Sequence, residues 1–180
     1  MKLYRARIPT IAKAVISTLS AEGLIEVTPA NATEAETDLV AIMEEYQRRD
    51  QALRNAVKDY MSSRAVPYEQ YSKVRSNLAG EWQHPLNDDI ERFLARQFVE
   101  NFMISNFIDE VFASDEDLYK RTVEIVRDHD VDERAIRDEA REKVKNVEEG
   151  SVDYEIALNN AVREVKKRHG LLTERDRPRG

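Results

Sequence analysis

The chain has 180 residues, of which 41% are hydrophobic and 35% are charged, and its formal net charge is −7. It contains no cysteine, which excludes disulfides, thiolate metal sites and a cysteine nucleophile. No apolar run approaches the roughly 18 residues that a membrane-spanning helix needs, and no signal-peptide pattern follows Met1. We therefore expect a cytoplasmic protein that does not span a membrane.

The charge is unevenly distributed along the chain. Residues 1–20 carry a net charge of +4 and residues 161–180 also carry +4, so the 140 residues between them carry −15. Two interpretations remain open: the basic ends neutralise the acidic body, or they present a cationic patch to an anionic partner. The candidate contacts for such a partner are Lys2, Arg5, Arg7, Lys166, Lys167, Arg168 and Arg175.

The first helix is expected from Ile8, where Pro9 suits the first turn, to Gly23, which suits a left-handed helix end. Apolar residues recur between them at helical spacing. Residues 24–27 are then expected to be a short strand or an extended segment that packs on the core.

A long helical pattern covers residues 33–63, with Asn31 or Thr33 as a candidate start. A polar interruption at residues 48–50 leaves two alternatives: one helix, or two helices with Asp50 as the cap of the second. A short helix is expected over residues 68–78, and residues 80–87 are expected to be a connector.

Residues 88–112 form the most apolar region, with apolar side chains over more than half of the helix circumference. A helix this apolar is buried by several neighbours or by a partner chain. Phe98, Phe102 and Phe107 are therefore candidates for an apolar interface. Trp82 in the connector is a further candidate, although most such tryptophans pin a loop to the core.

Three capped helices are expected to follow, starting at Ser114, Asp132 and Ser151, and the last ends at Gly170. The sequence thus predicts an all-α bundle of six to eight helices. Its expected parts are an N-terminal half (1–79), a connector (80–87), a C-terminal half (88–172) and a flexible basic tail (173–180). An internal duplication of the two halves is an open alternative, since residues 24–27 align with 108–111 and residues 52–55 with 135–138.

No arrangement of residues points to catalysis or to a cofactor. The three histidines, His84, His129 and His169, are far apart in sequence, and no phosphate-binding loop or nucleophile elbow is present. A metal site near residues 128–132 is outweighed by the role of Asp132 as a helix cap. We therefore expect no enzyme and no cofactor, with a dispersed acidic active site as the remaining enzymatic alternative.

A DNA-binding alternative comes from residues 19–27, which resemble the passage from recognition helix to wing in winged-helix proteins. No helix-turn-helix partner precedes this segment, and the chain is acidic, whereas DNA-binding domains are usually basic. This alternative is therefore less favoured.

Two segments together resemble an uncharacterised bacterial family, catalogued as domain of unknown function five hundred and seven. They are the start, from Met1 to Val27, and the end, from Ala157 to Leu171. The resemblance covers essentially the whole chain and implies a bacterial cytoplasmic protein, but it supplies no activity and no site residues.

Our leading functional hypothesis is a non-enzymatic helical interaction protein with a protein partner or a second copy of itself. The alternative is a protein that binds nucleic acid or ribosomes through its basic ends.

Overall fold

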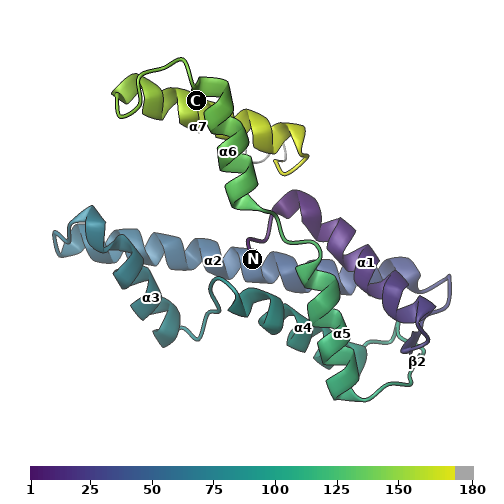
Figure 1. Ribbon diagram of the computed structural model, residues 1–180. Helices are drawn as coiled ribbons and strands as arrows, with labels where there is room; N and C mark the ends of the chain where they lie inside the picture. Colours follow the sequence, from purple (N-terminus) through teal and green to yellow (C-terminus); the bar gives the residue numbers. More distant parts are fainter. Residues whose placement is uncertain (173–180) are drawn as a thin grey trace. The chain divides into compact units, whose positions relative to one another are not determined.

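The computed structural model describes residues 1–172 and is an all-α fold, as the sequence predicts (Figure 1). The described residues contain seven α-helices, two short strands and two 3₁₀ turns. The helices are α1 (Ile8–Ala21), α2 (Ala32–Ser63), α3 (Tyr71–Glu81), α4 (Asp89–Phe102), α5 (Asp115–Arg127), α6 (Glu133–Val144) and α7 (Val152–Arg168); the strands are β1 (Ile25–Glu26) and β2 (Glu110–Val111), and the turns are η1 (Arg5–Arg7) and η2 (Tyr68–Gln70).

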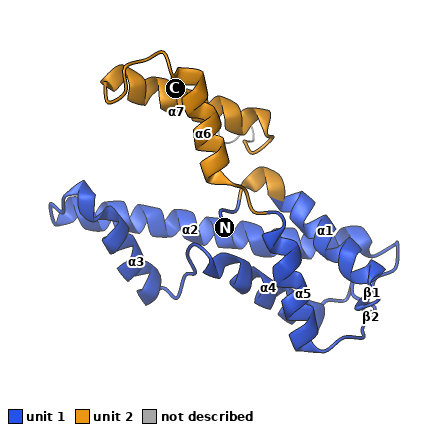
Figure 2. Cartoon of the chain, viewed as in Figure 1, with its two compact units in different colours: residues 1–3, 8–129 blue, residues 4–7, 130–180 orange. Residues whose placement is uncertain are grey.

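The chain forms two compact units, coloured separately in Figure 2. Unit 1 contains residues 1–3 and 8–129, and unit 2 contains residues 4–7 and the chain from Asp130 onward. This division differs from the expected halves, because residues 80–87 lie inside unit 1. The reason is that the helices on both sides of this connector, α3 and α4, pack against α2. The expected tail, residues 173–180, lies outside the described residues.

The core of unit 1 lies between α1, α2, α4 and α5. Phe98 and Phe102 are 0% and 2% exposed within this core, so the prediction that they form an interface with another chain is wrong. Helices α2 and α5 pack against α4, so the apolar side chains around α4 are covered inside the unit. The expected helix over residues 88–112 also ends earlier, at Phe102, and β2 occupies its last residues.

Unit 1 contains two successive helix–strand–helix segments, and their strands pair with each other. Ile25 of β1 is opposite Val111 of β2 in an antiparallel ladder. The first segment is α1–β1–α2 and the second is α4–β2–α5; α1 packs on α5, and α4 packs correspondingly on α2. This arrangement fits the proposed alignment of residues 24–27 with 108–111. It does not extend to residues 52–55 and 135–138, because these lie in α2 of unit 1 and α6 of unit 2.

Most predicted helix ends are confirmed. Gly23 and Gly170 follow α1 and α7 with φ angles of +69° and +65°. The side chains of Ser114, Asp132 and Ser151 each accept a backbone N–H in the first turn of their helices. The predicted cap at the start of α2 is wrong: Asn31 makes no capping hydrogen bond and instead donates to Oδ1 of Asp109 over 3.2 Å.

Helix α2 is a single helix of 32 residues, which settles the alternatives left open by the polar interruption at residues 48–50. At 1.5 Å per residue it is about 48 Å long. Asp50 is not a cap, because it lies in the middle of the helix and is buried.

Unit 2 is a hairpin of α6 and α7 completed by residues 4–7. Tyr4 is buried in its small core, with Ile136, Ala140, Tyr154 and Val165 among the neighbours. The N-terminal segment is thus an integral part of the C-terminal unit. In residues 1–172, no helix has the length and apolar character needed to cross a membrane.

Candidate functional site

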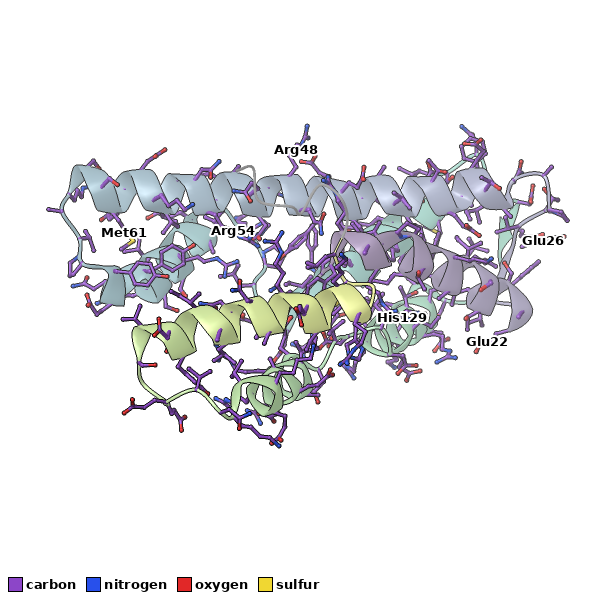
Figure 3. The ribbon with its side chains drawn as sticks, turned by 90° about the horizontal axis from the view of Figure 1, so that it is seen from above. Glu22, Glu26, Arg48, Arg54, Met61 and His129 are labelled. Carbon is purple, nitrogen blue, oxygen red and sulfur yellow. The ribbon has the colours of Figure 1, made fainter. Side chains whose placement is uncertain are left out.

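The second half of α2, η2 and α3 form a substructure that we call the α2–α3 lobe, residues 48–81. It has its own hydrophobic cluster, built on Leu53, Val57, Met61, Val74 and Ala79, separate from the main core of unit 1. Figure 3 shows Arg54 and Met61 on one side of α2 and Arg48 on the opposite side. The lobe is therefore a part of unit 1 with a small hydrophobic core of its own.

A buried carboxylate joins the two helices of the lobe. Asp50 is 6% exposed and forms ion pairs with Arg54, one turn further along α2, and with Arg75 of α3. Nη2 of Arg75 donates to Oδ1 of Asp50 over 2.8 Å. Both guanidinium groups remain partly exposed, so the pairing holds them at the surface in fixed positions.

A buried histidine completes this cluster from the connector. His84 is 4% exposed; its Nε2 lies 3.4 Å from Oδ1 of Asp50, and its ring stacks on Tyr46 with centroids 4.8 Å apart. The hydroxyl of Tyr46 donates to the carbonyl of Pro85 over 3.1 Å. The connector is thereby fastened to α2 beside the ion pairs.

The environment shifts the pKa values of this cluster in directions that follow from burial and charge. Burial alone would raise the pKa of Asp50, but Arg54 and Arg75 outweigh it and lower that pKa. Burial lowers the pKa of His84, and Asp50 offsets this only in part. Burial raises the pKa of Tyr46. At neutral pH the cluster thus contains an ionised Asp50 and a neutral His84.

The α2–α3 lobe is basic although unit 1 is acidic. Residues 48–81 contain seven basic and four acidic side chains, a net charge of +3. Unit 1 as a whole has a net charge of −8, so its other residues carry −11. The basic side chains of the lobe are Arg48, Arg49, Arg54, Lys58, Arg64, Lys73 and Arg75.

Aromatic side chains are exposed at the end of the lobe, where α2 turns into α3. Tyr68 is 80% exposed, and its ring stacks on that of Tyr71 with centroids 5.7 Å apart and planes inclined by 28°. Cζ of Arg64 lies 4.0 Å from the centroid of the Tyr60 ring. These contacts hold the rings in place without burying them, which is typical of residues that dominate binding interfaces.

The turn inside the lobe and the connector after it have an unusual backbone. Ala65, Gln83 and Asn87 have φ angles of +49°, +51° and +54°, and they are the only non-glycine residues with positive φ in residues 1–172. Ala65 follows α2 and Gln83 follows α3, at positions where glycine is usual. Such conformations are often concentrated at functional sites.

The structure brings several of the predicted basic contacts into unit 2. Arg5 and Arg7 belong to this unit, as do the residues at the end of α7. Nζ of Lys166 lies 5.4 Å from the centroid of the Tyr4 ring and 3.1 Å from Oε2 of Glu133. Arg168 forms an ion pair with Glu139, whereas Lys167 is exposed. Lys2 lies in unit 1, and Arg175 lies outside the described residues.

Unit 2 has no net excess of positive charge. Its described residues contain 11 basic and 11 acidic side chains, and acidic groups of α6 already engage Lys166 and Arg168. The basic ends are thus partly neutralised within the unit, as one of the two interpretations of the sequence expects.

The remaining predicted apolar contacts, Phe107 and Trp82, are less buried than Phe98 and Phe102. Phe107 is half-buried against the main core, and Trp82 is 38% exposed. Nη2 of Arg49 donates to the backbone carbonyl of Trp82 over 3.2 Å. Trp82 therefore lies beside the α2–α3 lobe.

Sequence reasoning missed the α2–α3 lobe for an identifiable reason. The net charge of the long stretch between the two ends averages the basic residues 48–81 with the acidic residues around them. The net charge taken over a window of 34 residues indicates the lobe, because seven basic residues and three exposed or partly exposed tyrosines fall within it.

The fold and the lobe define an all-α protein with a helix–strand–helix core, a basic aromatic lobe and a helical hairpin. The family model described as protein of unknown function (DUF507) matches residues 1–171. The chain belongs to this family. A search of curated proteins found no match.

Proposed function

We propose that this protein is a non-enzymatic cytoplasmic interaction protein that binds a macromolecular partner through the α2–α3 lobe. The observation that carries this proposal is the exposed ring of Tyr68, stacked on the half-buried Tyr71, at the end of the lobe where Arg64 lies over the ring of Tyr60. Tyrosine and arginine are enriched among the residues that contribute most to binding, because they offer large contact areas and several hydrogen bonds.

The ordering of these side chains also supports binding. A ring that is already held by stacking loses less conformational freedom when a partner covers it. The ion pair between Asp50 and Arg75 holds α3 on α2, so the two helices that carry this surface are joined before a partner arrives. The lobe therefore has the residue types and the preorganisation that a binding surface needs.

Affinity capture from the native host, followed by mass spectrometry, tests this proposal. The tagged wild-type protein is compared with the double variant Arg64→Gln/Tyr68→Ala. We expect one or more partners that the wild type retains and the variant loses. The matched control is Arg92→Gln/Phe112→Ala, which removes an exposed cation and an exposed ring elsewhere in unit 1.

The proposal fails if the wild type, the lobe variant and the control retain the same partners. Static light scattering of the same proteins measures self-association, because the partner could also be a second copy of the chain. A dimer that dissociates only in the lobe variant would make a second copy of the chain the partner.

A second candidate function is binding of nucleic acid or ribosomes through the basic ends. It is favoured by one observation: Arg5 and Arg7 from the start of the chain and Lys167 from its end belong to the same compact unit. Ribosome cosedimentation of the wild type and of Arg5→Gln/Arg7→Gln/Lys167→Gln tests it. Equal cosedimentation of both proteins, or of neither, would reject the basic ends as the binding site.

A further inference from the structure

We propose that the partner of the α2–α3 lobe is single-stranded nucleic acid, with bases stacked on the tyrosines and phosphates held by the surrounding cations. This inference rests on the proposed function and names the chemistry of its partner. Proteins that bind single strands without strong sequence preference combine a positive surface with aromatic rings on which bases stack. The lobe has both features within residues 48–81.

The local charge favours a polyanion even though the whole chain is acidic. The lobe carries +3, and the −11 of unit 1 lies outside it. Glu45 is the last acidic residue of α2 before the lobe begins. It lies 15 residues from Tyr60 at the end of the lobe, which corresponds to about 22 Å along the helix. The Debye length at physiological ionic strength is about 8 Å, so the acidic residues of α2 that precede the lobe contribute little to the potential at its end.

Three cations at this end form no ion pair with a carboxylate of the described residues, and they outnumber the two exposed carboxylates there, Asp59 and Glu69. Lys58 and Lys73 are exposed and form no ion pair with any described residue, and Arg64 is held over the ring of Tyr60. Arg54 and Arg75, by contrast, share Asp50. Lys58, Arg64 and Lys73 can therefore neutralise phosphates and release the counterions of the nucleic acid, which is the main source of its affinity.

The tyrosines explain why a single strand fits better than a duplex. A base can stack on Tyr68 only if its face is free, and in a duplex the faces of the bases are covered by their neighbours. Tyr68 is exposed and its ring stacks on that of Tyr71, so a base on the other face of Tyr68 would extend an existing stack. An acidic protein segment could pair with the same cations, but its carboxylates would not use the exposed ring.

Fluorescence anisotropy of the full-length protein with a fluorescein-labelled oligouridine of about 12 nucleotides tests the proposal. The titration is repeated with an oligothymidine and with a duplex of the same length, between about 50 and 200 mM salt. We expect binding of both single strands and weaker binding of the duplex. Tyr68→Ala should weaken binding of the single strands about fivefold or more, whereas Tyr68→Phe should retain it because the ring remains.

The triple variant Lys58→Gln/Arg64→Gln/Lys73→Gln tests the cations. Each phosphate contact on a single strand contributes about 0.7 to the slope of log affinity against log salt, so this slope should fall by about 2. Arg92→Gln is the control and should leave the slope unchanged; Arg5→Gln/Arg7→Gln tests the competing site at the basic ends. All substituted side chains are at least partly exposed, and thermal melts verify that each variant is folded.

Absence of binding at the lowest salt overturns the inference. Binding that the lobe variants leave unchanged, or that Arg5→Gln/Arg7→Gln abolishes, overturns it as well. The proposed function has a separate outcome, because affinity capture can be repeated after nuclease treatment. A protein partner that survives nuclease and is lost in Arg64→Gln/Tyr68→Ala would support the lobe as a binding surface and reject nucleic acid as its partner.

Discussion

Arg75 of α3 donates a hydrogen bond over 2.8 Å to Asp50, a buried carboxylate in the middle of α2. The two residues are 25 positions apart and belong to different helices. Their contact fixes α3 on α2, and with it the surface that carries Tyr68 and Tyr71. A buried charge is costly unless it is paired, so this contact makes the lobe sensitive to changes at either residue.

Replacing Asp50 should destabilise the lobe. Asp50→Asn removes the negative charge that Arg54 and Arg75 share and leaves two guanidinium groups close together. We expect a loss of about 1–3 kcal/mol in the free energy of unfolding, measured by urea titration. Glu45→Gln is the control, because it removes an exposed ion pair with Arg48 and should change stability by less than about 0.5 kcal/mol. Equal effects of the two substitutions would contradict this role of Asp50.

Stability should fall as the pH falls, first through His84. Burial holds the pKa of His84 below its ordinary value of 6.5, with Arg49 and Arg75 acting in the same direction and Asp50 opposing them. Below about pH 6.5 the unfolded chain therefore binds a proton that the folded chain does not, which favours unfolding. Below the ordinary value of 3.8, Asp50 adds a loss of the same sign, because its folded pKa is also lowered.

Urea titrations at pH 7.5 and pH 5.5 measure the contribution of His84 at conditions on either side of its ordinary pKa. The loss of stability between these conditions should be smaller in His84→Gln than in the wild type. A wild type that becomes more stable at the lower pH would contradict the assigned sign.

The turn after α3 should become more stable with glycine. Gln83 has a φ angle of +51°, which costs an ordinary residue about 1 kcal/mol and glycine little. Gln83→Gly should therefore stabilise the protein by up to about 1 kcal/mol in thermal or urea unfolding. Gly23→Ala is the reciprocal test and should destabilise it by about 1 kcal/mol, because Gly23 has a φ of +69°. A destabilising Gln83→Gly would show that the glutamine side chain outweighs the backbone effect.

Phe98 should behave as a core residue and not as an interface residue. Phe98→Ala opens a cavity between α4 and its neighbours, and we expect a loss of about 3–5 kcal/mol. Ile104→Ala, at a side chain that is 80% exposed, should have little effect on stability. An unchanged unfolding midpoint in Phe98→Ala, with an altered mass in light scattering, would restore the interface that the sequence suggested.

The features that follow from local signals were predictable from the sequence. Gly23 and Gly170 end helices because only a few neighbouring backbone groups decide a helix end. Ser114, Asp132 and Ser151 begin helices because each side chain accepts an N–H two or three residues further on. The apolar spacing of α1 and α5 likewise indicates their buried faces directly.

The buried ion cluster that holds the lobe together depends on contacts between distant residues, which no local signal reveals; only the basic charge of residues 48–81 is visible in a short window of the sequence. Asp50 resembles a helix cap in the sequence, and only its contacts with Arg75 and His84, 25 and 34 residues away, show that it is a buried ion. The apolar residues 88–112 indicate burial correctly, but the sequence does not say whether the same chain provides the cover. The structure shows that α2 and α5 do so for Phe98.

We propose that the protein binds its partner at the end of the α2–α3 lobe. A photoreactive phenylalanine analogue introduced in place of Tyr68 in the native host tests it most directly, with the same analogue in place of Phe112 as the matched control. Both positions are exposed aromatic residues of unit 1. Irradiation should crosslink a partner at position 68 and not at position 112. Crosslinks at position 112 with none at position 68 would contradict the account.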